Sequence, residues 1–211
     1  LQHNLIMRHK IALAAREYFY ANNFIEIETP MMMKSTPEGA RDYLIPSRVH
    51  NGKFYALPQS PQIYKQLLMV AGFDKYFQIA PCFRDEDARA DRSPGEFYQL
   101  DFEMSFATQE DVFKVGEEVL SATFEKFAPE GSVVTQAPYP IISYKQAMLE
   151  FGTDKPDLRN PLRIIDLTDF FQRCTFAPFH GKTVRAIAVQ KKLSKGQHEK
   201  MLKFAQSIGM G

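Results

Sequence analysis

The chain has 211 residues, of which 45% are hydrophobic and 24% are charged. This composition is typical of a folded globular protein and excludes a disordered or collagen-like chain. Lysine and arginine together number 26 against 25 acidic residues, so the formal net charge is +1. The chain therefore lacks the strong basic field that attracts nucleic-acid phosphates. Any nucleic-acid partner must be held by a local basic patch or by parts of the protein outside this sequence.

Other common classes are excluded by missing patterns. The two cysteines, Cys82 and Cys174, lie far apart without metal-ligand spacing, which favours a reducing, cytoplasmic location. No apolar run approaches the roughly 18 residues of a membrane-spanning helix, so no membrane partner is expected. A P-loop and a Rossmann glycine fingerprint are both absent from the sequence, which excludes the common nucleotide-binding routes.

Hydrophobic periodicity and the positions of turn-forming residues predict the elements of the first part of the chain. In order, these are a helix over 8–22, a strand over 24–29, a polar loop over 34–42, a short strand over 54–57 and a helix over 61–71. Ser60 is expected to cap the second helix, and Gly72 to end it.

An antiparallel hairpin is predicted over 76–106. Tyr98, Leu100 and Phe102 alternate with Gln99 and Asp101, which is typical of half-buried strands. Beyond the hairpin, the sequence predicts helices over 108–127 and 143–151, a turn-rich boundary at 154–161, a strand over 184–189 and a basic helix over 194–208. The first of these helices has Thr108 and Asp111 as an approximate capping box.

One face of the hairpin carries candidate binding groups. Arg84 suits bidentate contact with phosphate or carboxylate oxygens, and Phe97 is an aromatic ring on which a nucleobase could stack. Asp101 and Glu103 are placed to receive a cation such as an ammonium group. The ordinary explanation of such a pattern is a solvated sheet face, and the pattern alone leaves that alternative open.

Two further groups of residues lie outside the hairpin. Gln62 and Lys65 share one face near the start of a helix, where a lysine favours a bound anion. In the loop 36–42, Gly39 lies between charged residues, which suggests a mobile flap that presents Glu38 to a ligand. A surface lysine and a solvated turn remain the alternative explanations.

Several stretches resemble a known family. Residues 24–30 (Phe-Ile-Glu-Ile-Glu-Thr-Pro) resemble motif 1 of class II aminoacyl-tRNA synthetases, and Phe83-Arg84-Asp85-Glu86 followed by Phe97 and Gln99 resembles motif 2. Residues 36–43, 58–62 and 154–159 are similar to the bacterial-type aspartyl-tRNA synthetases of this class. The resemblance runs nearly continuously from about Arg8 to Pro161. One departure is Gly95, an extra residue in the motif 2 loop.

The resemblance implies an α+β fold, with a class II synthetase-like antiparallel sheet flanked by helices. It also implies two domains: a catalytic core over 1–161 with motifs 1 and 2, and the start of a small α+β insertion (GAD-type) domain over 162–211. Motif 3 is absent, as are the anticodon-binding domain, the acidic metal ligands and a second arginine for the substrate side chain. We therefore expect the chain to be an excerpt of a longer protein and to be inactive alone.

The same resemblance implies aspartate–tRNA ligation through aspartyl-adenylate, with ATP as substrate, tRNA(Asp) as acceptor and Mg²⁺ ligands outside the chain. Arg84 would act in catalysis and contact both substrates. The residues implied for ATP are Arg84, Asp85, Glu86, Ser93 and Phe97. Those implied for L-aspartate are Glu38, Ser60, Gln62, Lys65, Arg84 and Asp101.

A homodimer through motif 1 is also implied. Three alternatives stay open: an asparaginyl-type enzyme, another adenylate-forming relative, and a non-catalytic paralogue that binds nucleotide or tRNA. Whether tRNA(Asn) is also charged is open as well.

Overall fold

The computed structural model describes residues 1–36, 38–86 and 95–209, and it divides into two compact units, Leu1–Tyr139 and Pro140–Gly211. Ser93, expected from the resemblance to contact ATP, lies outside the described residues. No helix in the described part of the chain is long and apolar enough to cross a membrane.

The first unit contains three helices and five strands among its described residues. In chain order they are α1 (Gln2–Ala21), β1 (Ile25–Glu26), β2 (Leu44–Pro46), β3 (Phe54–Ala56), α2 (Gln62–Val70), β4 (Lys75–Phe83), β5 (Glu96–Met104) and α3 (Gln109–Phe127). The predicted helices and the hairpin are confirmed, although α1 begins earlier than expected and the strand predicted over 24–29 shortens to β1. β2 was not predicted, because three residues are too few to show a period.

The main sheet has the strand order β1-β4-β5. β4 and β5 pair antiparallel along their whole length, from Lys75 opposite Met104 to Phe83 opposite Glu96. The expected antiparallel sheet flanked by helices is thus present, and the short strand β1 adds to it by running parallel to β4. β2 and β3 form a separate antiparallel pair.

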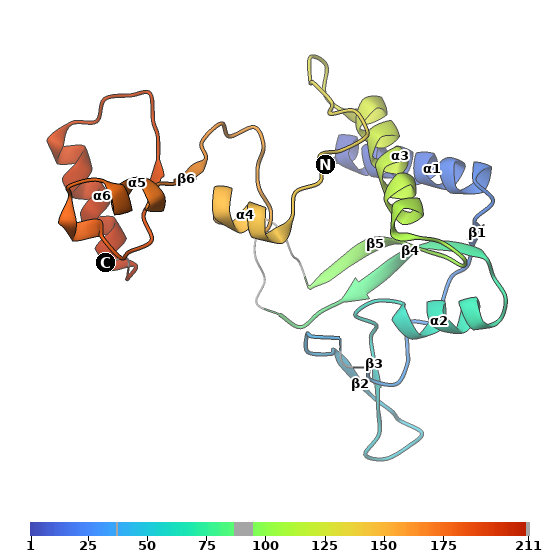
Figure 1. Ribbon diagram of the computed structural model, residues 1–211. Coiled ribbons are helices and arrows are strands. Elements are labelled where there is room, and N and C mark those ends of the chain that lie inside the picture. The colour runs from blue at the N-terminus through green and yellow to red at the C-terminus, as the bar shows by residue number, and fades with distance from the viewer. Residues whose placement is uncertain (37, 87–94, 210–211) are drawn as a thin grey trace. The chain divides into compact units, whose positions relative to one another are not determined.

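Helices lie on both sides of the β4–β5 pair, with α1 and α3 on one face and α2 on the other (Figure 1). The main core lies under α1 and α3. Phe19 of α1 is fully buried, and its ring stacks on that of Phe77 in β4 at a centroid distance of 4.6 Å. Phe24, Val115 and Val119 complete this cluster. Burial of these large apolar groups fixes the helices against the sheet.

Residues at the helix ends determine where several of the helices begin and stop. The Thr108 side chain accepts a hydrogen bond from the Asp111 amide, and the Asp111 carboxylate accepts one from the Thr108 amide, so the predicted capping box is confirmed. Gly72 follows α2 with a φ of 93°, a conformation that favours glycine. Ser60 does not cap α2, which has Pro61 at its N-cap and no side-chain cap.

The second unit contains α4 (Tyr144–Glu150), β6 (Ile164–Asp166), α5 (Thr168–Arg173), a 3-10 turn (Ala177–Phe179), β7 (Arg185–Ile187) and α6 (Lys195–Ser207). β6 and β7 pair antiparallel. The unit begins earlier than the domain boundary expected at 161/162, because α4 packs against β6. The Arg163 guanidinium lies over the Phe151 ring at 4.3 Å, which joins the two sides of that boundary. The boundary between catalytic and insertion domains stays a prediction.

Candidate active site

The candidate site is built on one face of the β4–β5 pair. Gln78 lies opposite Asp101 and Cys82 opposite Phe97, and directly opposed residues in a sheet project to the same face. Beyond the last of these pairs, the Arg84 amide donates to the carbonyl of Gly95 at 2.8 Å, so the pairing continues to Arg84. The Arg84 guanidinium lies 5.0 Å from the centre of the Phe97 ring. Arg84, Phe97 and Asp101 therefore share one face, as predicted.

This polar face is covered by protein, as the part of the apolar face under α1 and α3 is, and this argues against the alternative of a solvated face. Gln78 and Cys82 are 3% and 0% exposed, whereas Tyr98 and Leu100 on the apolar face are 52% and 41% exposed. The physical reason is that α2 and the turn before it lie over the polar face. On the other side, Tyr98 and Leu100 line an open groove of about 410 Å³ beside α1.

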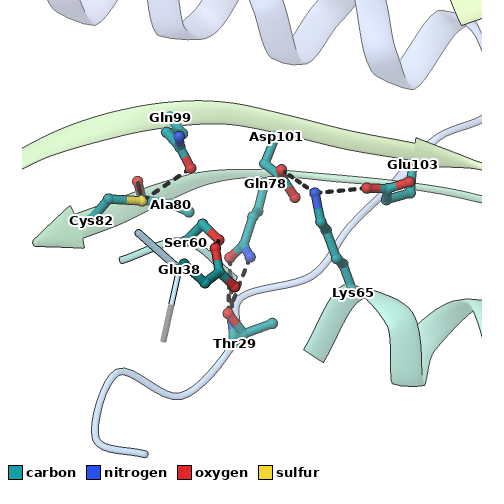
Figure 2. Close-up of polar contacts among 10 residues, drawn as sticks. All are labelled: Thr29, Glu38, Ser60, Lys65, Gln78, Ala80, Cys82, Gln99, Asp101 and Glu103. Atoms are coloured by element: carbon teal, nitrogen blue, oxygen red, sulfur yellow. Dashed lines mark hydrogen bonds and ion pairs between the residues drawn. The ribbon is translucent and has the colours of Figure 1, made fainter. Parts of the chain in front are cut away.

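Lys65 is the centre of the covered face. Its ammonium nitrogen lies 3.0 Å from Asp101 Oδ1 and 2.7 Å from Glu103 Oε1, between the two carboxylates (Figure 2). The Lys65 and Asp101 side chains are only 13% and 12% exposed. α2 supplies the lysine and β5 both acids, so contacts between the two elements align the three groups. The cation that Asp101 and Glu103 receive here is the chain's own.

Burial and charge set the ionisation of these groups. Burial alone would lower the pKa of Lys65, but the hydrogen bonds and charges of Glu103 and Asp101 outweigh it and raise that pKa above its ordinary value. Burial raises the pKa of the Asp101 carboxyl, and Lys65 only partly offsets this effect. The ammonium is therefore charged at neutral pH, and the site holds one cation between two acidic groups.

Lys65 and its neighbours on this face retain unused hydrogen-bonding capacity. An ammonium has three N–H donors, and two carboxylates account for two of those on Lys65. Among the described residues, Asp101 Oδ2, the Tyr76 hydroxyl and Arg84 Nε are buried with no hydrogen-bond partner. Both donor and acceptor groups therefore remain unpaired on this face, which suits a ligand that carries both a carboxylate and an ammonium group.

The turn before α2 meets residues 38–42, hereafter the flap. The Ser60 hydroxyl donates to Glu38 Oε2 at 2.6 Å, which explains why Ser60 is not the helix cap (Figure 2). Figure 2 shows the Glu38 and Ser60 side chains on the same side of the strands as Gln78 and Lys65. Gln62 is partly buried on α2, three residues before Lys65.

The remaining candidates lie around Arg84. Asp85 forms an isolated bridge with Arg41 of the flap, and its carboxylate lies 3.5 Å from the Arg41 guanidinium. The Asp85 side chain thus has a partner within the chain, although the sequence suggested a role at ATP. Glu86 is exposed, and its amide donates to the Arg84 carbonyl at 3.0 Å.

Two residues of the site were not selected from the sequence: Gln59 is 3% exposed and bonds to the flap, and Tyr76 is 0% exposed beside Asp101. Glu103 was expected to receive a cation, and in the structure it receives Lys65. The alternation of β5 already placed Glu103 on the correct face, but its partner lies in a distant helix. No local pattern indicates the contacts of Gln59 or Tyr76. Over the described ranges, no group of three or more potential metal ligands comes together.

An arginine beside a phenylalanine ring, on the same sheet face as a lysine held between two carboxylates, matches the arrangement that the resemblance to class II synthetases implies. The family model for tRNA synthetases class II (D, K and N) matches residues 1–205. The chain belongs to this family.

Curated relatives and solved structures agree with this assignment. The chain is 60% identical over 190 residues to an aspartate–tRNA(Asp/Asn) ligase of Zymomonas mobilis, covering 90% of this chain and 32% of that protein. It is 54% identical over 216 residues to one of Orientia tsutsugamushi, covering 99% and 36%. The asparaginyl-tRNA synthetase of Pyrococcus horikoshii, solved with asparaginyl-adenylate, matches with a TM-score of 0.58 and 26% identity over 68% of this chain and 36% of that one. The chain thus spans about a third of the length of these curated relatives.

Proposed function

We propose that this chain supplies the aspartate- and ATP-binding platform of an aspartate–tRNA ligase. The observation that carries the proposal is the Lys65 ammonium held at 3.0 Å from Asp101 and 2.7 Å from Glu103 on the same sheet face as Arg84. The names of its close relatives support the same activity. The proposal assigns L-aspartate, ATP and tRNA(Asp) as substrates.

The reaction has two steps. A carboxylate oxygen of the aspartate α-carboxyl attacks the α-phosphorus of ATP, and the bond to the bridging oxygen breaks to release pyrophosphate. A hydroxyl of the terminal ribose of tRNA then attacks the carbonyl carbon of the adenylate, loses its proton and displaces AMP. Because the first nucleophile is already ionised at neutral pH, the first step needs no general base. The protein contributes alignment and charge stabilisation.

Arg84 is assigned the central role in the first step. Its guanidinium would bridge the α-phosphate and the attacking carboxylate, where two anions meet. At about 4 Å and an effective dielectric constant of 20, one such contact contributes on the order of 4 kcal/mol. Since charge builds on the phosphoryl oxygens as the new bond forms, this attraction is greatest in the transition state. Phe97 would stack with the adenine, and Glu86 would contact its amino group.

Lys65 and Asp101 are assigned to the amino acid. The remaining N–H of Lys65 would bind the side-chain carboxylate of aspartate, and Asp101 Oδ2 would accept from its ammonium group. Ser60, Gln62 and Glu38 would complete the ammonium side. The two acids partly offset the Lys65 charge, so strong discrimination against asparagine requires the second arginine that the family resemblance places outside this chain.

Other parts of the proposal concern the whole protein. Mg²⁺ would neutralise the ATP phosphates when bound, and the family resemblance places its ligands outside this chain. The motif 1 segment, residues 24–30 with β1, is the proposed homodimer contact. Cytoplasmic location accords with the two free cysteines.

The proposal is tested by aspartate-dependent exchange of labelled pyrophosphate into ATP by the whole protein. We expect exchange with aspartate, and Arg84→Ala should reduce it by several orders of magnitude. A matched control is Arg8→Ala, because Arg8 lies over the Tyr98 ring at 4.5 Å on the opposite face of the same strand. Near-normal exchange in Arg84→Ala would refute the role of Arg84.

The second candidate is an asparaginyl-type enzyme, which the match to the Pyrococcus horikoshii structure favours. The same exchange assay with asparagine distinguishes the two. Lys65→Met should weaken aspartate far more than ATP, since only the aspartate carboxylate is assigned to this ammonium. Equal weakening of both ligands would argue against that assignment. A non-catalytic paralogue would show no exchange with any amino acid.

A further inference from the structure

The side chain of Gln59 is almost entirely committed to the flap. Gln59 is 3% exposed and lies in the turn directly before Ser60. Its Nε2 donates to the Ala40 carbonyl at 2.9 Å and to Asp42 Oδ1, and its Oε1 accepts from the Ala40 amide at 3.1 Å. Both amide hydrogens and the carbonyl oxygen are therefore satisfied by flap atoms.

This arrangement favours one position of the flap. A buried carboxamide that loses its partners costs roughly 1–3 kcal/mol, because burial prevents water from replacing them. If the flap moved away, Gln59 would lose its contacts to both Ala40 and Asp42. The Ser35 hydroxyl also donates to Asp42, which holds this carboxylate from the other side.

The contacts of Gln59 lie at the centre of the flap, and functional groups lie on either side. Two residues before Ala40, Glu38 accepts from Ser60 at 2.6 Å. Next to Ala40, the Arg41 carbonyl accepts from the Asp85 amide at 3.0 Å, beside Arg84. The position that Gln59 gives to Ala40 and Asp42 thus determines where Glu38 and Arg41 lie.

We propose that Gln59 is a positioning residue that holds the flap in place, so that Glu38 meets Ser60 beside the proposed amino-acid site and the Arg41–Asp85 bridge forms. The inference rests on the proposed function for its kinetic consequence, but not for its structural one. Gln59 touches no substrate in this scheme and acts through Glu38.

The direct test is hydrogen exchange at the Ala40 amide in the whole protein. Gln59→Leu keeps the side chain near its original size but removes every polar contact. We expect exchange at Ala40 to become about tenfold faster or more, since about 1.4 kcal/mol corresponds to a factor of ten. Gln78→Leu is the matched control. Gln78 is also 3% exposed, but it bonds to Thr29 instead of the flap, so Ala40 exchange should stay unchanged.

A kinetic measurement accompanies the exchange measurement. In the pyrophosphate assay, Gln59→Leu should raise KM for aspartate about tenfold while kcat at saturating aspartate changes less than about threefold. Unchanged Ala40 exchange in Gln59→Leu would overturn the inference. If wild-type protein activates no aspartate, the proposed function fails, while the exchange result still decides the role of Gln59.

A second variant covers the case in which Gln59→Leu does not fold. Asp42→Ala removes one acceptor of Gln59 from the flap side and leaves the buried turn untouched. It should also accelerate Ala40 exchange, by a smaller factor because the two Ala40 contacts remain. Ala40 exchange equal to that of the wild type in this variant would likewise count against the inference.

Discussion

The Nζ atom of Lys65 lies closer to Glu103 Oε1, at 2.7 Å, than to Asp101 Oδ1, at 3.0 Å. Glu103 is the more exposed of the two acids, with 36% of its side chain accessible against 12% for Asp101. The outer acid therefore holds the lysine from the solvent side. Only Oδ1 of Asp101 takes part in this contact, and Oδ2 is buried with no hydrogen-bond partner.

The first prediction distinguishes two effects of Glu103: its hydrogen bond, which positions Lys65, and its negative charge. Glu103→Leu removes the outer acceptor, and KM for aspartate should rise about tenfold or more, because a hydrogen bond to a charged group contributes roughly 1.5–3 kcal/mol. Glu103→Gln keeps an acceptor oxygen and should stay within about threefold of wild type. The pyrophosphate assay measures both, and KM for ATP should change little.

Exposed Glu125 on α3 provides the control, and Glu125→Gln should behave as wild type. If Glu103→Gln were as damaging as Glu103→Leu, the charge of Glu103 would matter more than its contact. The proposal that Glu103 acts by holding Lys65 in position would then be wrong.

The second prediction concerns the ring beneath Arg84. Phe97→Leu removes the aromatic face that lies 5.0 Å from the Arg84 guanidinium. Base stacking on an aromatic side chain contributes roughly 1–3 kcal/mol, so KM for ATP should rise about tenfold or more, while Phe97→Tyr should keep most of the affinity. Tyr98→Leu is the control, since it removes the ring beneath Arg8 on the opposite face. Equal KM values for ATP in Phe97→Leu and the wild type would exclude stacking on Phe97.

Local patterns were sufficient to predict much of the scaffold. Strict alternation in β5 gives the register, and this places Asp101 on the Arg84 face before any contact is known. Thr108 and Asp111 lie three residues apart, so their capping box can be recognised in the sequence itself. Each of these features depends on residues that are close along the chain.

The features that could not be predicted depend on contacts between distant residues. Serine is well suited to cap a helix, but the Ser60 hydroxyl instead donates a hydrogen bond to Glu38, which lies 22 residues earlier in the chain. Lys65 and Glu103 meet only because α2 crosses over β5. The polar face is buried for the same reason: its cover comes from elsewhere in the chain, which alternation within a strand does not indicate.

The third prediction concerns Gly95, the residue that departs from the family pattern. An added Cβ would lie 2.6 Å from the Tyr43 hydroxyl and 3.3 Å from the Arg84 carbonyl oxygen. Gly95→Ala should therefore displace Arg84 and lower kcat in the pyrophosphate assay. Tyr43→Phe removes the closer contact, so the double variant should recover part of the activity.

Gly116→Ala is the matched control, because nothing lies within 4 Å of an added Cβ at this position in α3. Replacing a helix-interior glycine should stabilise the protein by up to about 1 kcal/mol without changing kcat. Additive effects of Gly95→Ala and Tyr43→Phe on kcat would indicate that the two residues do not interact.

The fourth prediction uses the buried thiol beneath the site. Burial raises the pKa of Cys82 from 9.0 to about 11. Between these values the unfolded chain loses the thiol proton while the native protein keeps it, so the free energy of unfolding should fall as pH rises through this window. Two pKa units correspond to about 2–3 kcal/mol in total.

Urea unfolding at about pH 8 and about pH 10.5 measures this effect. Tyr76 and Lys65 have raised pKa values and also reduce stability at high pH, so the informative quantity is the difference between wild type and Cys82→Ala. We expect the wild type to lose more stability than Cys82→Ala, because the alanine variant has no thiol at this buried position. An identical pH dependence in Cys82→Ala and the wild type would mean that the thiol ionises as readily in the native protein as in the unfolded chain.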